Sequence, residues 1–215
     1  MRPQRVLIIG LDGGTFDLIQ PWARQGYLPN LRRLLEEGTS TELLSTFPPV
    51  TSPAWPSFMT GMNPGKHSVF DFIRARSTGY DMVNSTSIQQ PTLWDHLSAA
   101  GFRVGVMNVP VTYPPRPING FIITGLLSPN QGNICYPPDL IRRYEPSLGR
   151  YWVTPEVQYK RSDPEPFLAE LRAITETHGR YAQALLEGEA WDVLMVVFGA
   201  TDICLLYTSP SPRDS

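Results

Sequence analysis

The chain has 215 residues, which is enough for one sizeable domain. Hydrophobic residues make up 41% of the sequence and charged residues 18%, a balance typical of a folded protein and not of a disordered one. The formal net charge of −2 gives no general attraction to nucleic acid or to an anionic membrane. We therefore expect no nucleic-acid polymer and no membrane among the partners. A local binding site must hold any anionic substrate.

The sequence shows no targeting or membrane segment. The apolar run Val6–Leu11 is shorter than a secretory signal and ends at Asp12, and no apolar stretch approaches the roughly 20 residues that span a bilayer. Cys135 and Cys204 provide neither a disulfide framework nor a metal-ligand spacing. We therefore expect a soluble, cytoplasmic protein.

The C-terminal segment from Cys204 to Ser215 does not resemble the rest of the sequence. Its residues up to Asp214 correspond to the in-frame translation of a tagmentation sequencing adapter, so we expect residues 204–215 to be non-native. A genuine polar tail is the alternative. On the first interpretation residues 1–203 are a partial domain, and native sequence ends at about Ile203.

Apolar periodicity and helix caps predict the first half of the fold. The run Val6–Leu11 is typical of a strand buried on both faces of a parallel sheet. Helices are expected over 16–23, over 29–37 ending at Gly38, and over 52–60, with a short strand at 42–44. Residues 63–90 are polar and rich in Gly and Ser, which indicates a long excursion over the site that can act as a small cap.

The second half alternates helices with strands in the same way. Thr92 is a natural N-cap for a helix over 93–100. Further helices are expected at 137–144 and 164–186, and strands at 103–109, 120–126 and 193–198. This alternation predicts an α/β fold with a mostly parallel central sheet and helices on both faces.

Two carboxylates follow apolar strands of this sheet. Asp12 comes just after the first strand and Asp202 just after the last, so both are expected at the carboxyl-end rim where α/β sheets bind ligands. An isolated Asp at such a position is more often a helix N-cap. Two of them on one rim favour ligation of a hard divalent cation, because such cations take anionic oxygen ligands.

Thr51 is the candidate nucleophile. It lies between a proline-rich loop, Phe47-Pro48-Pro49, and the start of a helix. The structural interpretation is that Thr51 or Ser52 simply caps this helix. The functional one is that a helix N-terminus attracts phosphate, and that a metal-bound hydroxyl there has a pKa low enough for nucleophilic attack. A second metal would stabilise the leaving oxygen.

Several segments together carry a family resemblance. The chain resembles the type I phosphodiesterase/nucleotide pyrophosphatase branch of the alkaline phosphatase superfamily, most of all its microbial phosphohydrolase/phosphomutase members. The resemblance covers residues 5–203. Its motifs are Gly10-Leu11-Asp12-Gly13-Gly14, Leu28-Pro29-Asn30-Leu31, the segment from Phe47 to Trp55, the segment from Thr60 to His67, the segment from Asn108 to Pro115, and the segment from Trp191 to Asp202.

The resemblance implies an alkaline phosphatase-like fold and a metal-dependent phosphohydrolase. Such an enzyme would act on small phosphorylated substrates, either phosphate monoesters or diesters, through a phosphothreonine intermediate. The resemblance also implies two divalent metal ions, of which zinc is the first expectation and manganese or magnesium the alternatives. Asp12 and Thr51 would share one ion, and Asp202 would begin an Asp-x-x-x-His pair for the other. Leu206 stands where that His is expected, so this fragment should bind metal poorly or not at all. The segment His67–Phe72 lacks the Asn of nucleotide pyrophosphatases, which weakens the case for nucleotide diesters.

Other interpretations stay open. A sulfatase needs Cys or Ser followed by x-Pro-x-Arg, whereas this chain has Thr51-Ser52-Pro53-Ala54-Trp55. A non-catalytic nucleotide-binding module would use Gly10–Gly14 as its phosphate loop, but that loop lacks both the G-x-G-x-x-G spacing and the Walker lysine. An inactive fragment is the third possibility.

One further polar residue is a candidate of lower rank, and the three histidines are not candidates for the site. Asn108 ends a strand on the expected rim and is a candidate substrate contact. His67 lacks a partner at ligand spacing and is interpreted as a loop-stabilising residue. His96 and His178 lie on predicted helices among polar neighbours, so both are expected at the surface.

Overall fold

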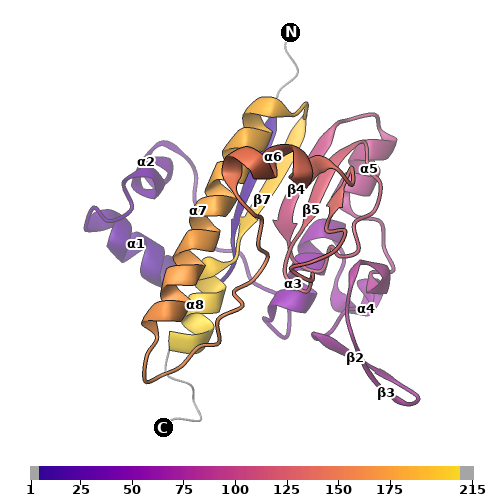
Figure 1. Cartoon of the computed structure of the whole chain (residues 1–215), viewed down its shortest axis with the longest axis horizontal. Helices are drawn as coiled ribbons and strands as arrows, with labels where there is room; N and C mark the ends of the chain where they lie inside the picture. Colours follow the sequence, from indigo (N-terminus) through magenta and orange to yellow (C-terminus); the bar gives the residue numbers. More distant parts are fainter. Residues whose placement is uncertain (1–4, 209–215) are drawn as a thin grey trace.

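The computed structural model describes residues 5–208, and it describes side chains as far as residue 205. A five-stranded sheet in the order β1-β7-β4-β5-β6 forms its centre (Figure 1). The four strands β1, β7, β4 and β5 run parallel to one another, and the short β6 pairs antiparallel with β5. The strands are β1 Val6–Leu11, β4 Val104–Val109, β5 Gly120–Thr124, β6 Cys135–Tyr136 and β7 Val193–Phe198.

Helices connect these strands, and a separate hairpin extends from one connection. The hairpin consists of β2 Ile73–Arg76 and β3 Gly79–Met82, which pair antiparallel. The helices are α1 Phe16–Arg24, α2 Pro29–Glu37, α3 Thr51–Thr60, α4 Pro64–His67, the 3-10 turn Ser85–Ser87, α5 Leu93–Ala99, α6 Leu140–Leu148, α7 Glu165–Gly188 and α8 Ala200–Thr208.

The two faces of the sheet bury separate apolar clusters because successive side chains of a strand point to opposite faces. Leu194 and Val196 of β7 pack with Tyr181 and Leu185 of α7 on one face. Met195 and Val197 pack on the other face, in a cluster that also contains residues of α3 and α5. In Figure 1, α6 and α7 cross the face toward the viewer. The prediction of a mostly parallel sheet with helices on both faces is confirmed.

The burial predicted for the first strand is wrong. β1 forms and pairs with β7 in parallel as expected, but Ile9 is 57% exposed and Val6, Leu7 and Leu11 are also exposed. β1 lies at the edge of the sheet, and the nearest helices in sequence, α1 and α2, pack on each other. An apolar run indicates a strand, but whether its faces are covered depends on neighbours outside that run.

Two other local expectations also differ from the structure. Residues 42–44 form no strand, and Leu43 and Leu44 are almost fully exposed, because no described strand lies beside them to pair with. The helix expected at 137–144 begins only at Leu140. Pro138 disfavours helical geometry at Pro137, the residue before it, which explains the later start.

The excursion over 63–90 is anchored at its base and free at its tip. Val69 and Val83 are buried in the same cluster as Met59 of α3, whereas Tyr80 in the hairpin is 73% exposed. Figure 1 shows β2 and β3 extending away from the sheet on the side where α3 and α4 lie. Whether this excursion acts as a cap stays a prediction.

The predicted non-native tail overlaps the last described helix. Residues 204–208 continue α8, which begins at Ala200. The remainder of that tail, 209–215, lies outside the described residues. No described helix has the length and apolar character needed to cross a bilayer.

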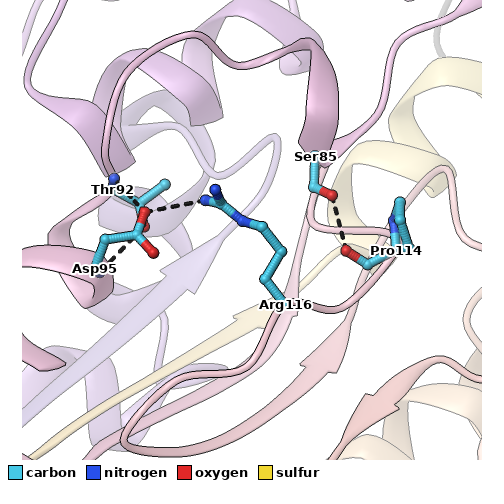
Figure 2. Close-up of polar contacts among 5 residues, drawn as sticks. All are labelled: Ser85, Thr92, Asp95, Pro114 and Arg116. Atoms are coloured by element: carbon cyan, nitrogen blue, oxygen red, sulfur yellow. Dashed lines mark hydrogen bonds and ion pairs between the residues drawn. The ribbon is translucent and has the colours of Figure 1, made fainter.

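A polar network fixes the proline-rich loop that follows β4 (Figure 2). Thr92 and Asp95 form a capping box at the start of α5, and the Arg116 guanidinium donates to the same Asp95 carboxylate at 3.0 Å. The Ser85 hydroxyl donates to the Pro114 carbonyl at 2.8 Å. The loop between β4 and β5 is therefore held at Pro114 and at Arg116.

Candidate active site

Asp12 lies at the end of β1, on the carboxyl-end rim of the sheet. Its backbone N–H donates to the Phe198 carbonyl at the end of β7, so the ends of the two strands are tied together. Burial, and then the nearby Asp202 carboxylate, raise the pKa of Asp12 to about 6. Interactions with the Trp55 indole N–H and the Gly13 backbone N–H oppose this rise without cancelling it.

Asp202 reaches the same rim from the first turn of α8. The Gly13 backbone has φ +71°, and a β carbon on Gly13 would fall 2.7 Å from the Asp202 Cα. Only glycine allows this close approach of the turn after β1 to α8. Burial also raises the pKa of Asp202. Two partly buried carboxylates therefore lie together at the rim, as the parallel topology predicts.

Trp55 attaches α3 to the end of β1. A β carbon on Gly10 would fall 2.6 Å from the Trp55 ring, so glycine at this position makes room for the indole against the strand. The same indole interacts with the Asp12 carboxylate. Thr51 is four residues before Trp55 and therefore shares its face of α3, one turn closer to the helix N-terminus.

The start of α3 has features that suit an anion. Val50 occupies the N-cap position and cannot cap with its side chain, so Thr51 is the first helical residue and not the cap. The Val50 carbonyl accepts from the Ala54 N–H, and Pro53 has no N–H. The N–H groups of Thr51 and Ser52 are therefore the donors that this helix end offers.

Two adjacent hydroxyls at this helix start differ in access. Ser52 is completely buried, and its Oγ has no hydrogen-bond partner in the described structure. Thr51 is only partly buried. Of the two, only Thr51 has a side chain that a substrate can reach.

Asn108 occupies the end of β4 at the same rim. Asp12, Asn108 and Asp202 line one small cavity of about 20 Å³. The Asn108 side-chain amide donates to the Val197 carbonyl of β7 at 2.8 Å. Three of the four candidate residues named from the sequence therefore line one cavity, and the fourth, Thr51, lies one turn before the Trp55 that interacts with Asp12. The roles of all four stay predictions.

The donor set of this rim suits a hard cation, because it offers carboxylate, amide and hydroxyl oxygens. Among the described residues, no group of three or more His, Cys, Asp or Glu side chains forms a ligand cluster. Asp12 and Asp202 are the two carboxylates that line the rim cavity, and Asn108 adds an amide. Thr51, at the start of α3, is the candidate source of a hydroxyl oxygen.

His67 and His178 make structural contacts, whereas His96 is exposed, as expected for it. His67 is fully buried; its Nε2 lies 2.8 Å from the Ser57 hydroxyl and its Nδ1 accepts from the Val69 N–H. The expectation for His67 is confirmed. His178 is also buried, contrary to the surface position expected for it, and it stacks on Tyr151. Helical spacing gave a usable signal, since His178 falls between Ile174 and Tyr181 on the buried face of α7.

Comparison with known proteins assigns the chain to a family. Residues 6–211 match the type I phosphodiesterase / nucleotide pyrophosphatase family. The chain belongs to this family. The match confirms the resemblance inferred from the motifs. No curated protein sequence matches the chain significantly.

Solved structures support the same fold. Phosphonoacetate hydrolase from Sinorhizobium meliloti 1021 in complex with phosphonoacetate is similar at a TM-score of 0.65 and 19% identity, over 94% of this chain and 47% of that one. Its complex with phosphonoformate gives 0.64 and 18%, over 93% and 47%. The chain thus spans about half the length of these structures. At this identity the likeness shows the fold alone, which is alkaline phosphatase-like as expected.

Proposed function

We propose that this phosphodiesterase-family domain belongs to a metal-dependent phosphohydrolase that cleaves small phosphate mono- or diesters through a phosphothreonine at Thr51. The observation that supports the proposal is that Asp12 and Asp202 line one cavity at the rim. Trp55 of α3 interacts with Asp12 and lies against Gly10, and Thr51 is one turn before Trp55 on the same helix face.

Each group has a role that its position supports. Asp12 and Asp202 would hold divalent cations, which supply Lewis-acid stabilisation of phosphate charge and lower the pKa of a bound hydroxyl. The Thr51 and Ser52 N–H groups would bind a phosphate oxygen at the helix N-terminus. The Thr51 oxygen would then form a bond to phosphorus while the ester oxygen leaves, and water would later release phosphate from Thr51.

The proposed metal and cellular location follow from the sequence. The presence of two divalent ions, with zinc as the first expectation, stays a prediction. So do the cytoplasmic location and the non-native origin of residues 204–215. The structural relatives were solved with phosphonoacetate and phosphonoformate. Small phosphonates therefore belong in the substrate panel beside phosphate mono- and diesters.

The first test is made on a full-length enzyme that carries this domain. Thr51→Ala should abolish turnover of nitrophenyl phosphate mono- and diesters and leave the fold unchanged, whereas Thr51→Ser should keep part of the activity because it keeps the hydroxyl. Ser52→Ala is the matched control, since Ser52 is completely buried. Full activity of Thr51→Ala would refute the nucleophile.

Mass spectrometry of the quenched reaction gives a second, direct measurement. The peptide that contains Thr51 should gain one phosphoryl group in the wild-type enzyme and none in Thr51→Ala.

Metal dependence separates the hydrolase from a nucleotide-binding module. A chelator should stop hydrolysis, and added divalent cation should restore it. A module that binds nucleotide through Gly10–Gly14 alone would keep its binding after chelation. Binding without turnover, unaffected by the chelator, would favour that module.

A further inference from the structure

Asn108 occupies a β-bulge at the carboxyl end of β4. Met107 pairs with Ile123 of β5 and Val109 pairs with Thr124, so Asn108 is the extra residue between two paired positions. Its φ is +60°, a left-handed conformation that Asn tolerates better than most residues. Bulges are common beside active sites because they redirect a side chain. Here the redirected side chain is an amide.

The orientation of this amide is fixed by its partner. The Nδ2 group donates to the Val197 carbonyl at 2.8 Å, and a carbonyl can only accept. A flipped amide would place two oxygens against each other, so Oδ1 must point away from Val197. Asn108 is 5% exposed, and its Oδ1 has no hydrogen-bond partner among the described residues. A buried acceptor left unpaired is unfavourable, because it loses its hydrogen bonds to water and gains none in the protein.

The surroundings of Asn108 are short of positive charge. Asp12 and Asp202 line the same cavity, and its other described lining residues are apolar side chains or glycine. Two carboxylates and an amide thus meet without a Lys, Arg or His among the described lining residues. The cavity, at about 20 Å³, has room for one ion or one water molecule and not for a substrate. A cation would give the Asn108 oxygen a partner and would offset the charge of the two carboxylates.

We propose that Asn108 supplies a neutral oxygen ligand, through Oδ1, to one of the divalent cations that Asp12 and Asp202 would hold at this rim. The inference rests on the metal-dependent function proposed above and adds a ligand to it. The Val197 hydrogen bond then has a purpose, since it aims Oδ1 at the ion as outer-shell hydrogen bonds aim metal ligands. Asn108 is a positioning and binding residue for the cation and need not touch the substrate.

The test is Mn²⁺ binding by the chain as it stands, measured as the loss of the free-ion EPR signal and as the Mn²⁺-induced shift in melting temperature. Wild type is expected to bind weakly, in the millimolar range. Asn108→Gly keeps the left-handed backbone and removes the oxygen, and should weaken binding about tenfold. Asn108→Asp keeps an oxygen and adds a charge, so it should bind Mn²⁺ at least about tenfold more tightly.

The melting temperature gives a second readout, because Mn²⁺ would not restore the stability lost at a residue with a merely structural role. Asn108→Asp loses the donor to Val197 and adds a third carboxylate, so its metal-free form should melt well below wild type. Mn²⁺ should restore much of that loss. The matched control is Asn119→Asp, because the Asn119 side chain likewise donates to backbone carbonyls, at Gly101 and Phe102, but lies at the start of β5. Its loss should not be restored by Mn²⁺.

Three results would overturn the proposal, and they separate it from the proposed function. If both Asn108 variants bind Mn²⁺ like wild type while Asp12→Asn abolishes binding, Asn108 is no ligand but the cation site at the rim stands. If Asp12→Asn also binds like wild type, the ion lies elsewhere and both ideas fail. If no variant binds Mn²⁺, Asn108→Asp included, the proposal and the metal site both fail.

Discussion

Gly13 and Asp202 are in backbone contact at the rim, although they are far apart in the sequence. A β carbon on Gly13 would lie 2.7 Å from the Asp202 Cα and 2.8 Å from its backbone nitrogen. Backbone atoms cannot move aside as a flexible side chain can. The turn after β1 therefore packs directly against the backbone at the start of α8, and the positions of Asp12 and Asp202 relative to each other depend on this contact.

Gly13→Ala should destabilise the domain by more than about 2 kcal/mol, because overpacking against backbone adds to the strain of a left-handed alanine. Gly26→Ala is the matched control: Gly26 has φ +86° with open space around it, so only the backbone strain, about 1 kcal/mol, is expected. Urea unfolding of both variants gives the comparison. Equal losses would mean that the contact with Asp202 relaxes without cost.

Asp12 should make the metal-free domain less stable as pH rises. Its pKa is about 6 in the folded state against an ordinary value of 3.8, so between these values the folded state holds the proton more tightly than the unfolded chain does. By linkage, stability is highest below the unfolded pKa and falls as pH rises through about 6. Allowing for the partial exposure of Asp12, the loss is on the order of 2 kcal/mol.

Asp12→Asn removes this loss and still accepts from the Trp55 indole. In the presence of a chelator, urea unfolding at pH 8 should show the variant to be more stable than wild type, and the two should converge near pH 4. Residues kept for function often lower stability, so a gain on replacing Asp12 fits its proposed role. A variant less stable than wild type at pH 8 would show that the charged carboxylate is well compensated.

Local sequence determined much of this fold. Pro29 and Gly38 define α2 at both ends, and Thr92 begins α5 with the expected cap. The shared rim of Asp12 and Asp202 follows from parallel strands alone. What could not be predicted depends on distant partners: the exposure of β1, the missing strand at 42–44 and the contact of Trp55 with Asp12. The bulge at Asn108 belongs to this second group, since only its pairing with β5 reveals the extra residue.

The exposed face of β1 should drive self-association. Ile9 is 57% exposed on an edge strand that pairs only with β7 among the described strands, and an apolar edge strand is a recognised aggregation hazard. Ile9→Lys should lower the association seen by light scattering as concentration rises, and should change stability by less than about 1 kcal/mol. Val196→Lys, at the register partner buried in β7, should instead unfold the domain.

Leu44→Lys gives a second control for that prediction. Leu44 is 97% exposed but lies in a segment without strand structure. If its effect on association equals that of Ile9→Lys, general hydrophobicity and not the edge of the sheet is responsible.

His178 should make the domain lose stability in mild acid. Burial lowers its pKa to about 4, and the neutral ring donates from Nε2 to the Trp152 carbonyl at 2.7 Å and stacks on Tyr151. Between the ordinary histidine pKa of 6.5 and about 4 the unfolded chain binds the proton more tightly, so stability falls as pH decreases through this window. The direction is opposite to that expected for Asp12.

The variant His178→Gln isolates this effect from that of Asp12. Its side-chain amide can still donate to Trp152, but it cannot titrate, and it loses the stacking on Tyr151. At pH 7.5 it should be less stable than wild type by about 1–2 kcal/mol. The difference should shrink on going to pH 5, because only the wild-type unfolded chain gains a proton at this position. Urea unfolding at both pH values measures the two differences, and a gap that widens in acid would contradict a neutral, buried His178.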